Sequence, residues 1–181
     1  MARLYLVRHG KSEKGFDEAL DSPLSKLGIK QAQDVAHFLN GRMLPIPIIS
    51  SPCQRAVETA GFLDQLWISG ITTALPMSEI PYPVAQDKIG ISNRRPWLNH
   101  ILQQSYNDLS IGIMTWRDQA IQYILNQIND AVIFTHYLTI NALVGYAETD
   151  PRVVIFDPDY CNVTEISVSG GKIEIVDLTI R

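Results

Sequence analysis

Short apolar runs alternate along this chain with segments in which apolar residues recur at every third or fourth position. The runs at 4–7, 46–49, 71–75 and 131–135 are typical of strands that are buried on both faces of a sheet. The segments between them have the spacing of helices that bury one face. Strands separated by helices favour a mainly parallel sheet with a helical layer on each face, so we predict a three-layer α/β/α fold.

Capping residues mark the ends of the predicted helices. Ser25 is expected to be the N-cap of the first helix, and Gly41 is expected to lie just past its end. A later helix is expected to be capped by Thr115 and to carry Ile128 on its buried stripe. The pattern therefore predicts boundaries as well as elements.

The middle and the end of the chain depart from this alternation. Residues 76–114 are rich in proline and have little periodicity apart from a short helical pattern after Pro96. Apolar and polar residues alternate on both sides of Gly170 and Gly171, which predicts a β-hairpin that adds antiparallel edge strands to the sheet. We expect residues 1–181 to form one domain, with 76–114 as an insertion over the sheet.

The charge balance excludes some classes of partner. The 181 residues include 15 Lys and Arg against 19 Asp and Glu, which gives a formal net charge of -4. A chain without a global positive field is not expected to bind nucleic acid or an anionic membrane surface. No apolar stretch approaches the roughly 20 residues of a membrane span. An anion site must therefore be local.

The two cysteines, Cys53 and Cys161, are far apart in the sequence. They make neither a CxxC metal or redox motif nor a disulfide framework. The N-terminus has a short apolar run that ends in charges and not in a small-residue cleavage site, so it does not resemble a signal peptide. We expect a cytoplasmic protein in a reducing compartment.

Polar side chains follow each of the four predicted strands. Arg8 and His9 follow the first strand, and Arg55 lies in the first turn of the helix after the second. Glu79 follows the third strand, and His136 follows the fourth. Because ligands bind beyond the carboxyl ends of the strands in such sheets, we expect these five side chains to converge on one rim.

Two arginines, two histidines and one glutamate suit a phosphoryl-transfer site. Arginine offers a fixed fork of donors to phosphate oxygens, and a neutral imidazole can attack phosphorus to form a covalent intermediate. For any one of these residues alone, a surface charge or a structural histidine is the simpler interpretation. Their joint placement favours the functional one. His37 and His100 have no such setting, so we interpret them as structural.

Four segments resemble one known family. Residues 6–12 read LVRHGKS, and residues 22–32 read SPLSKLGIKQA, which is similar to a PLTxxGxxQA motif. Residues 51–60 read SPCQRAVETA, similar to SPLxRAxQTA, and residues 132–144 read VIFTHYLTINALV, which resembles a second-histidine segment. In this order and spacing, the segments resemble the histidine phosphatase superfamily, also called the phosphoglycerate mutase-like family.

The resemblance implies a role for each residue of the predicted rim. His9 would be the nucleophile that accepts the phosphoryl group, and Arg8, Arg55 and His136 would bind the phosphoryl oxygens. Glu79 would be the acid that protonates the leaving oxygen. The segment around Glu79 resembles the acid segment of the family, although the Gly-x-x-Glu-Gly that often follows is missing.

Other departures from the family pattern concern the substrate pocket. Lys11 stands where Glu or Gln is usual, and Tyr137 replaces the Gly that often follows the second histidine. We take these two residues and Ser12 as candidates for substrate binding. Arg94 and Arg95 are a further pair of candidates, which would bind a carboxylate or a second phosphate of the substrate unless they form a solvated turn.

Two other phosphatase chemistries fit the sequence less well. A cysteine-based phosphatase needs Cys-x5-Arg, whereas Cys53 and Arg55 are separated by one residue. Asp157 and Asp159 resemble an aspartate-nucleophile loop, but Cys161 stands in its final position and the motif belongs near the N-terminus. We interpret Cys53 as a small buried hydrophobe and the aspartates as part of a turn.

The resemblance implies a phosphatase that needs neither a metal nor a cofactor. It would cleave a phosphomonoester or a protein phosphohistidine through a phosphohistidine on His9, so its partner would be a phosphorylated small molecule or a phosphohistidine protein. A phosphomutase would share every catalytic residue, although 181 residues is short for that branch. A regulatory or binding module with little turnover is the other alternative. The sequence leaves the substrate and the oligomeric state open.

Overall fold

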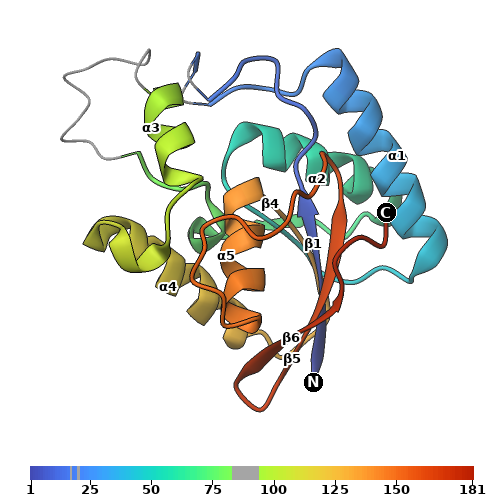
Figure 1. Cartoon of the computed structure of the whole chain (residues 1–181). Helices are drawn as coiled ribbons and strands as arrows, with labels where there is room; N and C mark the ends of the chain where they lie inside the picture. Colours follow the sequence, from blue (N-terminus) through green and yellow to red (C-terminus); the bar gives the residue numbers. More distant parts are fainter. Residues whose placement is uncertain (17, 20, 83–93) are drawn as a thin grey trace.

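A computed structural model describes residues 1–16, 18–19, 21–82 and 94–181. Within them, six strands form one sheet in the order β3-β2-β4-β1-β5-β6 (Figure 1). Strands β1 to β4 run parallel, and β5 is antiparallel to both β1 and β6, which confirms the mainly parallel sheet. The strands are β1 (Ala2–Arg8), β2 (Ile48–Ser50), β3 (Ile71–Thr73), β4 (Ala131–Thr135), β5 (Val163–Ser169) and β6 (Lys172–Asp177).

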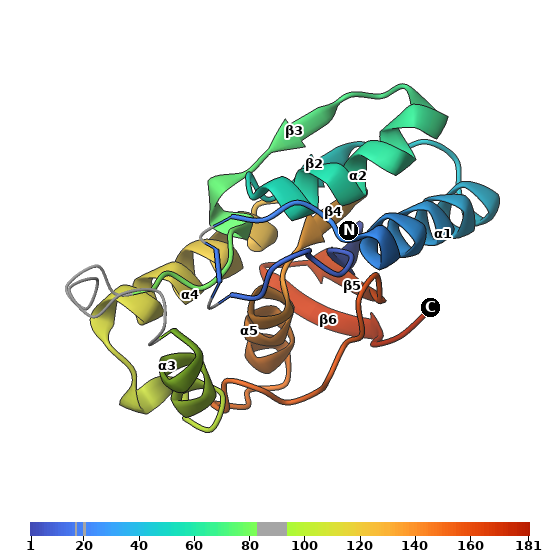
Figure 2. The ribbon, with the colours of Figure 1, turned by 90° about the horizontal axis from the view of Figure 1, so that it is seen from above.

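Helices cover both faces of this sheet. α1 and α2 pack on one face, and α4 and α5 pack on the other (Figure 2). The three-layer α/β/α fold is therefore confirmed. In the described part of the chain, no helix is long and apolar enough to cross a bilayer. The helices are α1 (Lys26–Arg42), α2 (Gln54–Trp67), α3 (Arg94–Ile101), α4 (Ile111–Leu125), α5 (Tyr137–Ala147) and the 3-10 helices η1 (Leu75–Met77) and η4 (Tyr106–Asp108).

Successive residues of the central strands pack against different helical layers. In β1, Leu6 packs with buried residues of α4 and α5, whereas Val7 packs with α1 and α2. Ile133 and Phe134 of β4 divide in the same way. Because neighbouring side chains of a strand point to opposite faces, a strand between two helical layers needs apolar residues throughout. This explains the continuous apolar runs in the sequence.

Three predicted helix boundaries are wrong. The N-cap of α4 is Ser110, and Thr115 lies inside the helix, where its hydroxyl donates to a carbonyl one turn earlier. Ile128 lies beyond the C-cap Asn126 and is 82% exposed. Gly41 lies inside α1 and not past its end.

The C-terminal hairpin forms where it was predicted. Gly170 and Gly171 both have positive φ, at 57° and 73°, which suits the tight turn between β5 and β6. The expectation of two edge strands is wrong for β5. It pairs with β1 as well as β6, so it lies inside the sheet and only β6 is at the edge.

Two glycines bring the start of α1 against the loop that follows β1. A Cβ added at Gly10 would lie 2.6 Å from the Gly28 carbonyl oxygen, and one added at Gly28 would collide with the backbone of Lys11. Ser25 is the N-cap of α1 as predicted, because its hydroxyl oxygen accepts a hydrogen bond from the Gly28 N–H. The same hydroxyl donates to the Lys11 carbonyl. The loop after His9 is therefore fixed to α1.

A third cluster of buried residues joins α3 and η4 to the first turns of α4 and α5. The predicted helix around Pro96 is confirmed as α3, which begins at Arg94. Of the predicted insertion, residues 83–93 lie outside the described part of the chain. The described residues of this region pack beside the carboxyl end of the parallel strands, at Ile80 and Leu138.

Candidate active site

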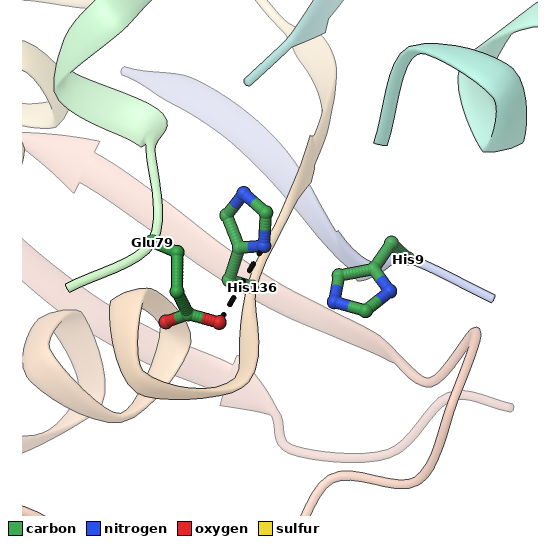
Figure 3. Close-up of side chains that lie close together, drawn as sticks. All are labelled: His9, Glu79 and His136. Atoms are coloured by element: carbon green, nitrogen blue, oxygen red, sulfur yellow. Dashed lines mark ion pairs between the residues drawn. The ribbon is translucent and has the colours of Figure 1, made fainter. Parts of the chain in front are cut away.

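The five side chains predicted for the rim come together at the carboxyl ends of the parallel strands. Arg8 is the last residue of β1, and the His9 N–H donates to the Thr135 carbonyl at the end of β4. Arg55 lies in the first turn of α2, Glu79 follows η1, and His136 is the N-cap of α5. Figure 3 shows His9, Glu79 and His136 around one space.

His9 is held as one neutral tautomer. Its Nδ1 lies 2.7 Å from the Gly10 carbonyl oxygen, which can only accept, so the ring proton is on Nδ1. Its Nε2 accepts a hydrogen bond of 3.0 Å from the Arg55 Nε–H, so the lone pair is on Nε2. A backbone carbonyl thus directs the unprotonated nitrogen of His9 toward the arginine.

Arg55 is the centre of the cluster. In addition to His9, it contacts His136 through Nη2 at 3.1 Å from Nδ1, and Glu79 at 3.8 Å. Asp21 lies 3.5 Å from its Nη1. Because a guanidinium can only donate, Nδ1 of His136 must carry a lone pair in this arrangement.

His136 is fully buried between a hydroxyl and a carboxyl group. Its Nε2 lies 2.7 Å from the Ser51 hydroxyl, and its Nδ1 lies 3.6 Å from Oε2 of Glu79 (Figure 3). Since Nδ1 is unprotonated, Nε2 carries the proton and donates to Ser51. The hydroxyl oxygen of Ser51 also accepts from the Cys53 N–H, so it is fixed by two hydrogen bonds.

Burial shifts the pKa values of all three titratable groups toward their neutral forms. It lowers the pKa of His9 well below 6.5, and the positive charge of Arg55 lowers it further. Burial and Arg55 act in the same way on the pKa of His136. Burial raises the pKa of Glu79 above 4.5, against the opposing charge of Arg55. The burial of the cluster thus favours the neutral imidazole of His9 and the neutral carboxyl group of Glu79.

Arg8 is held between two tyrosine rings. Its guanidinium carbon lies 3.9 Å from the ring centre of Tyr160 and 5.0 Å from that of Tyr137. Its Nη1 donates to the Pro158 carbonyl at 2.8 Å. Its buried Nε has no hydrogen-bond partner among the described residues. The arginine is thus positioned by stacking, which leaves donors available for an anion.

The cluster suits an anion better than a metal ion. His9, Glu79 and His136 offer ligand atoms within 4.8 Å of one another, as a metal site would. The Arg55 guanidinium, however, lies against all three, so a divalent cation would meet a fixed positive charge. The two arginines, beside a carboxyl group whose pKa burial raises, give the cluster a positive character that favours an anion such as phosphate.

A cavity of about 300 Å³ opens from this cluster. Of the candidates for substrate binding, Ser12, Tyr137 and Arg95 line it, together with four of the five catalytic candidates. The fifth, His136, is fully buried behind the wall. Lys11 and Arg94 are not among its described lining residues, so the structure does not bring them to the cavity. Its remaining wall includes the apolar residues Phe16, Ile80, Leu98, Leu102 and Leu138.

Arg94 is instead part of an aromatic cluster beside the cavity. It is 7% exposed, and its guanidinium carbon lies 5.4 Å from the ring centre of Phe16 and 5.0 Å from that of Tyr82. Trp97 contacts the same two rings. The cluster ties α3 to the loop after β1 and to the segment after Glu79, so Arg94 supports the cavity wall from behind.

The sequence analysis missed several residues of the site. It assigned no role to Ser51, to Tyr160 or to Asp157 as a cavity residue. A signal for the last two was present, because an antiparallel strand begins at the rim where parallel strands end. Residues that precede β5 are therefore expected at the same rim as residues that follow β1.

Ser51→Ala is expected to lower kcat about tenfold and to change KM less. The substitution leaves the buried Nε2–H of His136 without an acceptor, so the ring can turn or change tautomer. Phosphate release at varied substrate concentration and pH would measure the effect, and Ser51→Thr should restore much of it. Ser50→Ala is the matched control, because that buried hydroxyl donates to the Ser51 carbonyl and does not contact His136. Equal losses in both alanine variants would contradict this role.

Comparison with known proteins places the chain in one family. The model of the histidine phosphatase superfamily (branch 1) matches residues 4–181. A probable phosphoglycerate mutase of Proteus mirabilis is 32% identical over 92 residues, which are 49% of this chain and 42% of that protein. The chain spans less than half of the length of the curated relatives that it matches.

Two solved structures are similar over the whole chain. A mycobacterial glucosyl-3-phosphoglycerate phosphatase in complex with VO3 has a TM-score of 0.72 at 19% identity and covers 100% of both chains. A phosphoserine phosphatase of Entamoeba histolytica in complex with 3-phosphoglyceric acid has a TM-score of 0.71 at 20% identity, and the match covers 100% of this chain and 98% of that one. At these identities the likeness is one of fold.

Proposed function

This chain belongs to the histidine phosphatase superfamily, and from that membership and its site we propose that it is a phosphatase that hydrolyses phosphomonoesters. One observation carries the proposal. The lone pair of His9 points to Arg55, in a cavity whose burial lowers the pKa of His9 and raises the pKa of Glu79. We propose that no metal or cofactor takes part, because the two arginines supply the positive charge.

In the first step, His9 attacks the phosphorus of the bound ester. The Nε2 lone pair forms the N–P bond while the bond from phosphorus to the ester oxygen breaks. The proton of Glu79 moves to the departing oxygen, so the alcohol leaves neutral. Before this step the phosphoryl oxygens replace Nε2 as the acceptor of the Arg55 hydrogen bond.

In the second step, water hydrolyses the phosphohistidine. Glu79, now a carboxylate, accepts a proton from the water molecule whose oxygen attacks phosphorus. The N–P bond breaks and inorganic phosphate forms. His9 is neutral again and Glu79 is protonated again, so the cycle closes. Arg8 and Arg55 stabilise the charge on the phosphoryl oxygens in both steps.

A panel of phosphorylated compounds tests the proposal. p-Nitrophenyl phosphate, phosphoserine, 3-phosphoglycerate and a phosphohistidine protein would be assayed for phosphate release, with and without EDTA. We expect release from at least one phosphomonoester, inhibition by vanadate as a mimic of five-coordinate phosphorus, and no effect of EDTA. Loss of activity in EDTA that a divalent ion restores would contradict the metal-independent mechanism.

A phosphomutase is the second candidate, because of the match to a probable phosphoglycerate mutase. It would use the same residues, but it would have to keep the phosphohistidine until the product returned to it. The assay that separates the two follows labelled phosphate from 3-phosphoglycerate. Transfer to the neighbouring hydroxyl at a rate above that of phosphate release would establish the mutase.

We also propose that the protein works in the reducing cytoplasm, on a phosphorylated small molecule or a phosphohistidine protein. Neither Cys53 nor Cys161 forms a disulfide, which is consistent with a reducing compartment. We further propose that the region 76–114 determines substrate specificity within one domain of residues 1–181. The contribution of Arg95, Leu98 and Leu102 to the cavity wall supports this assignment.

Arg95→Ala is expected to raise KM about tenfold for an anionic substrate such as 3-phosphoglycerate. Arg95 lines the cavity, where it would bind a carboxylate away from the reacting phosphorus. The KM for p-nitrophenyl phosphate should not change. Lys30→Ala, which removes a positive charge from the exposed side of α1, is the control for net charge. Unchanged kinetics with both substrates would mean that Arg95 takes no part in recognition.

A further inference from the structure

A second carboxyl group lines the cavity besides the catalytic candidate. Asp157 belongs to the segment between α5 and β5 and lies in the cavity wall with Tyr137 and Tyr160. Burial, and next to it the negative charge of the nearby Asp157, raises the pKa of the Tyr137 hydroxyl. The Tyr137 ring lies against Arg8, which together with Arg55 forms the proposed phosphate clamp. Asp157 is therefore separated from this clamp by one side chain.

A carboxylate in this place needs an explanation. A phosphomonoester carries up to two negative charges, so a fixed anion beside its binding cavity weakens binding of every substrate that has no compensating group. A carboxylate has about four acceptor positions. Because Asp157 lines the cavity, a donor group of a bound substrate could use them.

The rest of the outer cavity does not neutralise this group. No ion pair joins Asp157 to another residue in the described part of the chain, and Arg8 donates to the Pro158 carbonyl instead. Lys14 and Arg95 also line the cavity. Beyond the phosphate clamp the cavity thus presents both signs of charge, which is typical of a site for a ligand that itself carries a positive group.

We propose that Asp157 binds a protonated amine on the alcohol part of the substrate, so that the preferred substrates are phosphate esters of small amino alcohols. This inference rests on the proposed phosphatase function. A volume of about 300 Å³ lies at the lower end for ligand pockets, which fits a small ester of this kind. Asp157 then acts as a specificity-determining residue and has no part in the chemical step.

Two esters of equal size test the inference. 2-Aminoethyl phosphate carries an ammonium group at pH 7, and 2-hydroxyethyl phosphate carries a neutral hydroxyl in the same position. We expect wild type to prefer the amine in kcat/KM by about tenfold, as for one hydrogen bond to a charged group. In Asp157→Asn, which keeps the size of the side chain but loses its charge, the two esters should have similar kcat/KM values. The amine loses its charged partner, and the neutral ester is no longer opposed by a fixed anion, so it should be hydrolysed at least as well as by wild type.

Two further variants separate recognition from structure. Asp159 lies two residues after Asp157, is exposed and does not line the cavity. Asp159→Asn therefore removes a charge of the same sign and should keep the preference for the amine. Tyr137→Phe removes the neighbouring hydroxyl but leaves the carboxylate, so it should also keep this preference. If Tyr137→Phe and Asp157→Asn lower activity on both esters alike, Asp157 only positions Tyr137 and the inference is overturned.

The control substrate distinguishes this inference from the proposed function. If wild type hydrolyses p-nitrophenyl phosphate but does not discriminate between the two esters, the phosphatase function stands and the assignment of Asp157 fails. If wild type releases phosphate from none of the three compounds or the wider panel, the phosphatase function itself fails.

Discussion

Replacing His9 by alanine is expected to abolish phosphate release. In the proposed mechanism the Nε2 lone pair of His9 is the nucleophile, and no other described side chain of the cavity is placed to replace it. His136 is the nearest imidazole, but its Nε2 is bonded to Ser51 and its Nδ1 faces Arg55 and Glu79. The measurement is the rate of phosphate release from p-nitrophenyl phosphate and from the best substrate of the panel.

His37→Ala is the matched control for this loss. His37 is an exposed residue of α1, so its replacement removes an imidazole without touching the cavity. We expect wild-type rates in this variant. Activity that persists in His9→Ala well above the uncatalysed rate would show that another group attacks phosphorus, and the mechanism would have to be abandoned.

Glu79→Gln is expected to slow the cleavage of alkyl phosphates by about 10² to 10⁴-fold, the usual contribution of a general acid. Glutamine keeps the acceptor that binds the Ile80 N–H but has no proton to give to the leaving oxygen. p-Nitrophenolate leaves without protonation, so the first turnover with p-nitrophenyl phosphate should be slowed much less. Single-turnover release of the alcohol from the two substrates is the measurement.

Arg55→Ala is the comparison that isolates the acid. In the proposed mechanism Arg55 binds the transferred phosphoryl group and not the leaving group, so its loss should slow both substrates by similar factors. Equal slowing of both substrates in Glu79→Gln would make Glu79 structural. Glu13 or Glu58 would then be the next candidate, although the Glu58 carboxylate already accepts from the Leu24 N–H and from Gln54 and does not line the cavity.

Glu79→Gln is also expected to change the pH dependence of activity. Catalysis needs a neutral His9 and a protonated Glu79, so activity falls below the pKa of His9 and above that of Glu79. Burial lowers the pKa of His9 well below 6.5 and raises the pKa of Glu79 above 4.5. The acid limit of activity therefore moves to lower pH and the alkaline limit to higher pH, which widens the active range on both sides. Glu79→Gln should remove the fall on the alkaline side, because glutamine does not titrate.

The sequence located the catalytic cluster because the topology of the sheet dictates it. His9 and His136 both follow buried parallel strands, and such strands end at one edge. The prediction needed only the order of elements and the residues after each strand. The same prediction could not identify Ser51 as a hydrogen-bond partner of His136. Ser51 directly follows β2, and no pattern in the sequence distinguishes it from an ordinary loop residue.

Arg94 and Arg95 show what adjacency in sequence cannot decide. Both lie in the first turn of α3, where successive side chains point about 100° apart. One therefore lies at the cavity and the other in the aromatic cluster with Phe16 and Tyr82. Which arginine has which role depends on how α3 is rotated against the sheet, and tertiary packing sets that rotation.

The start of α4 was mispredicted for a similar reason. Thr115 is a good capping residue, whereas Ser110 is the N-cap without a side-chain hydrogen bond. The extra turn is formed because Ile113 is buried in the cluster that joins α3 and η4 to α5. Packing between elements therefore overrode the local capping signal.

Trapping the covalent intermediate tests the central claim most directly. Wild-type protein would be mixed with a ³²P-labelled substrate, quenched within a single turnover, and digested for peptide mapping. The account predicts label on His9, in a bond that is labile in acid and stable in base, and no label in His9→Ala. Label that survives acid, or that appears equally in His9→Ala, would contradict the phosphohistidine mechanism.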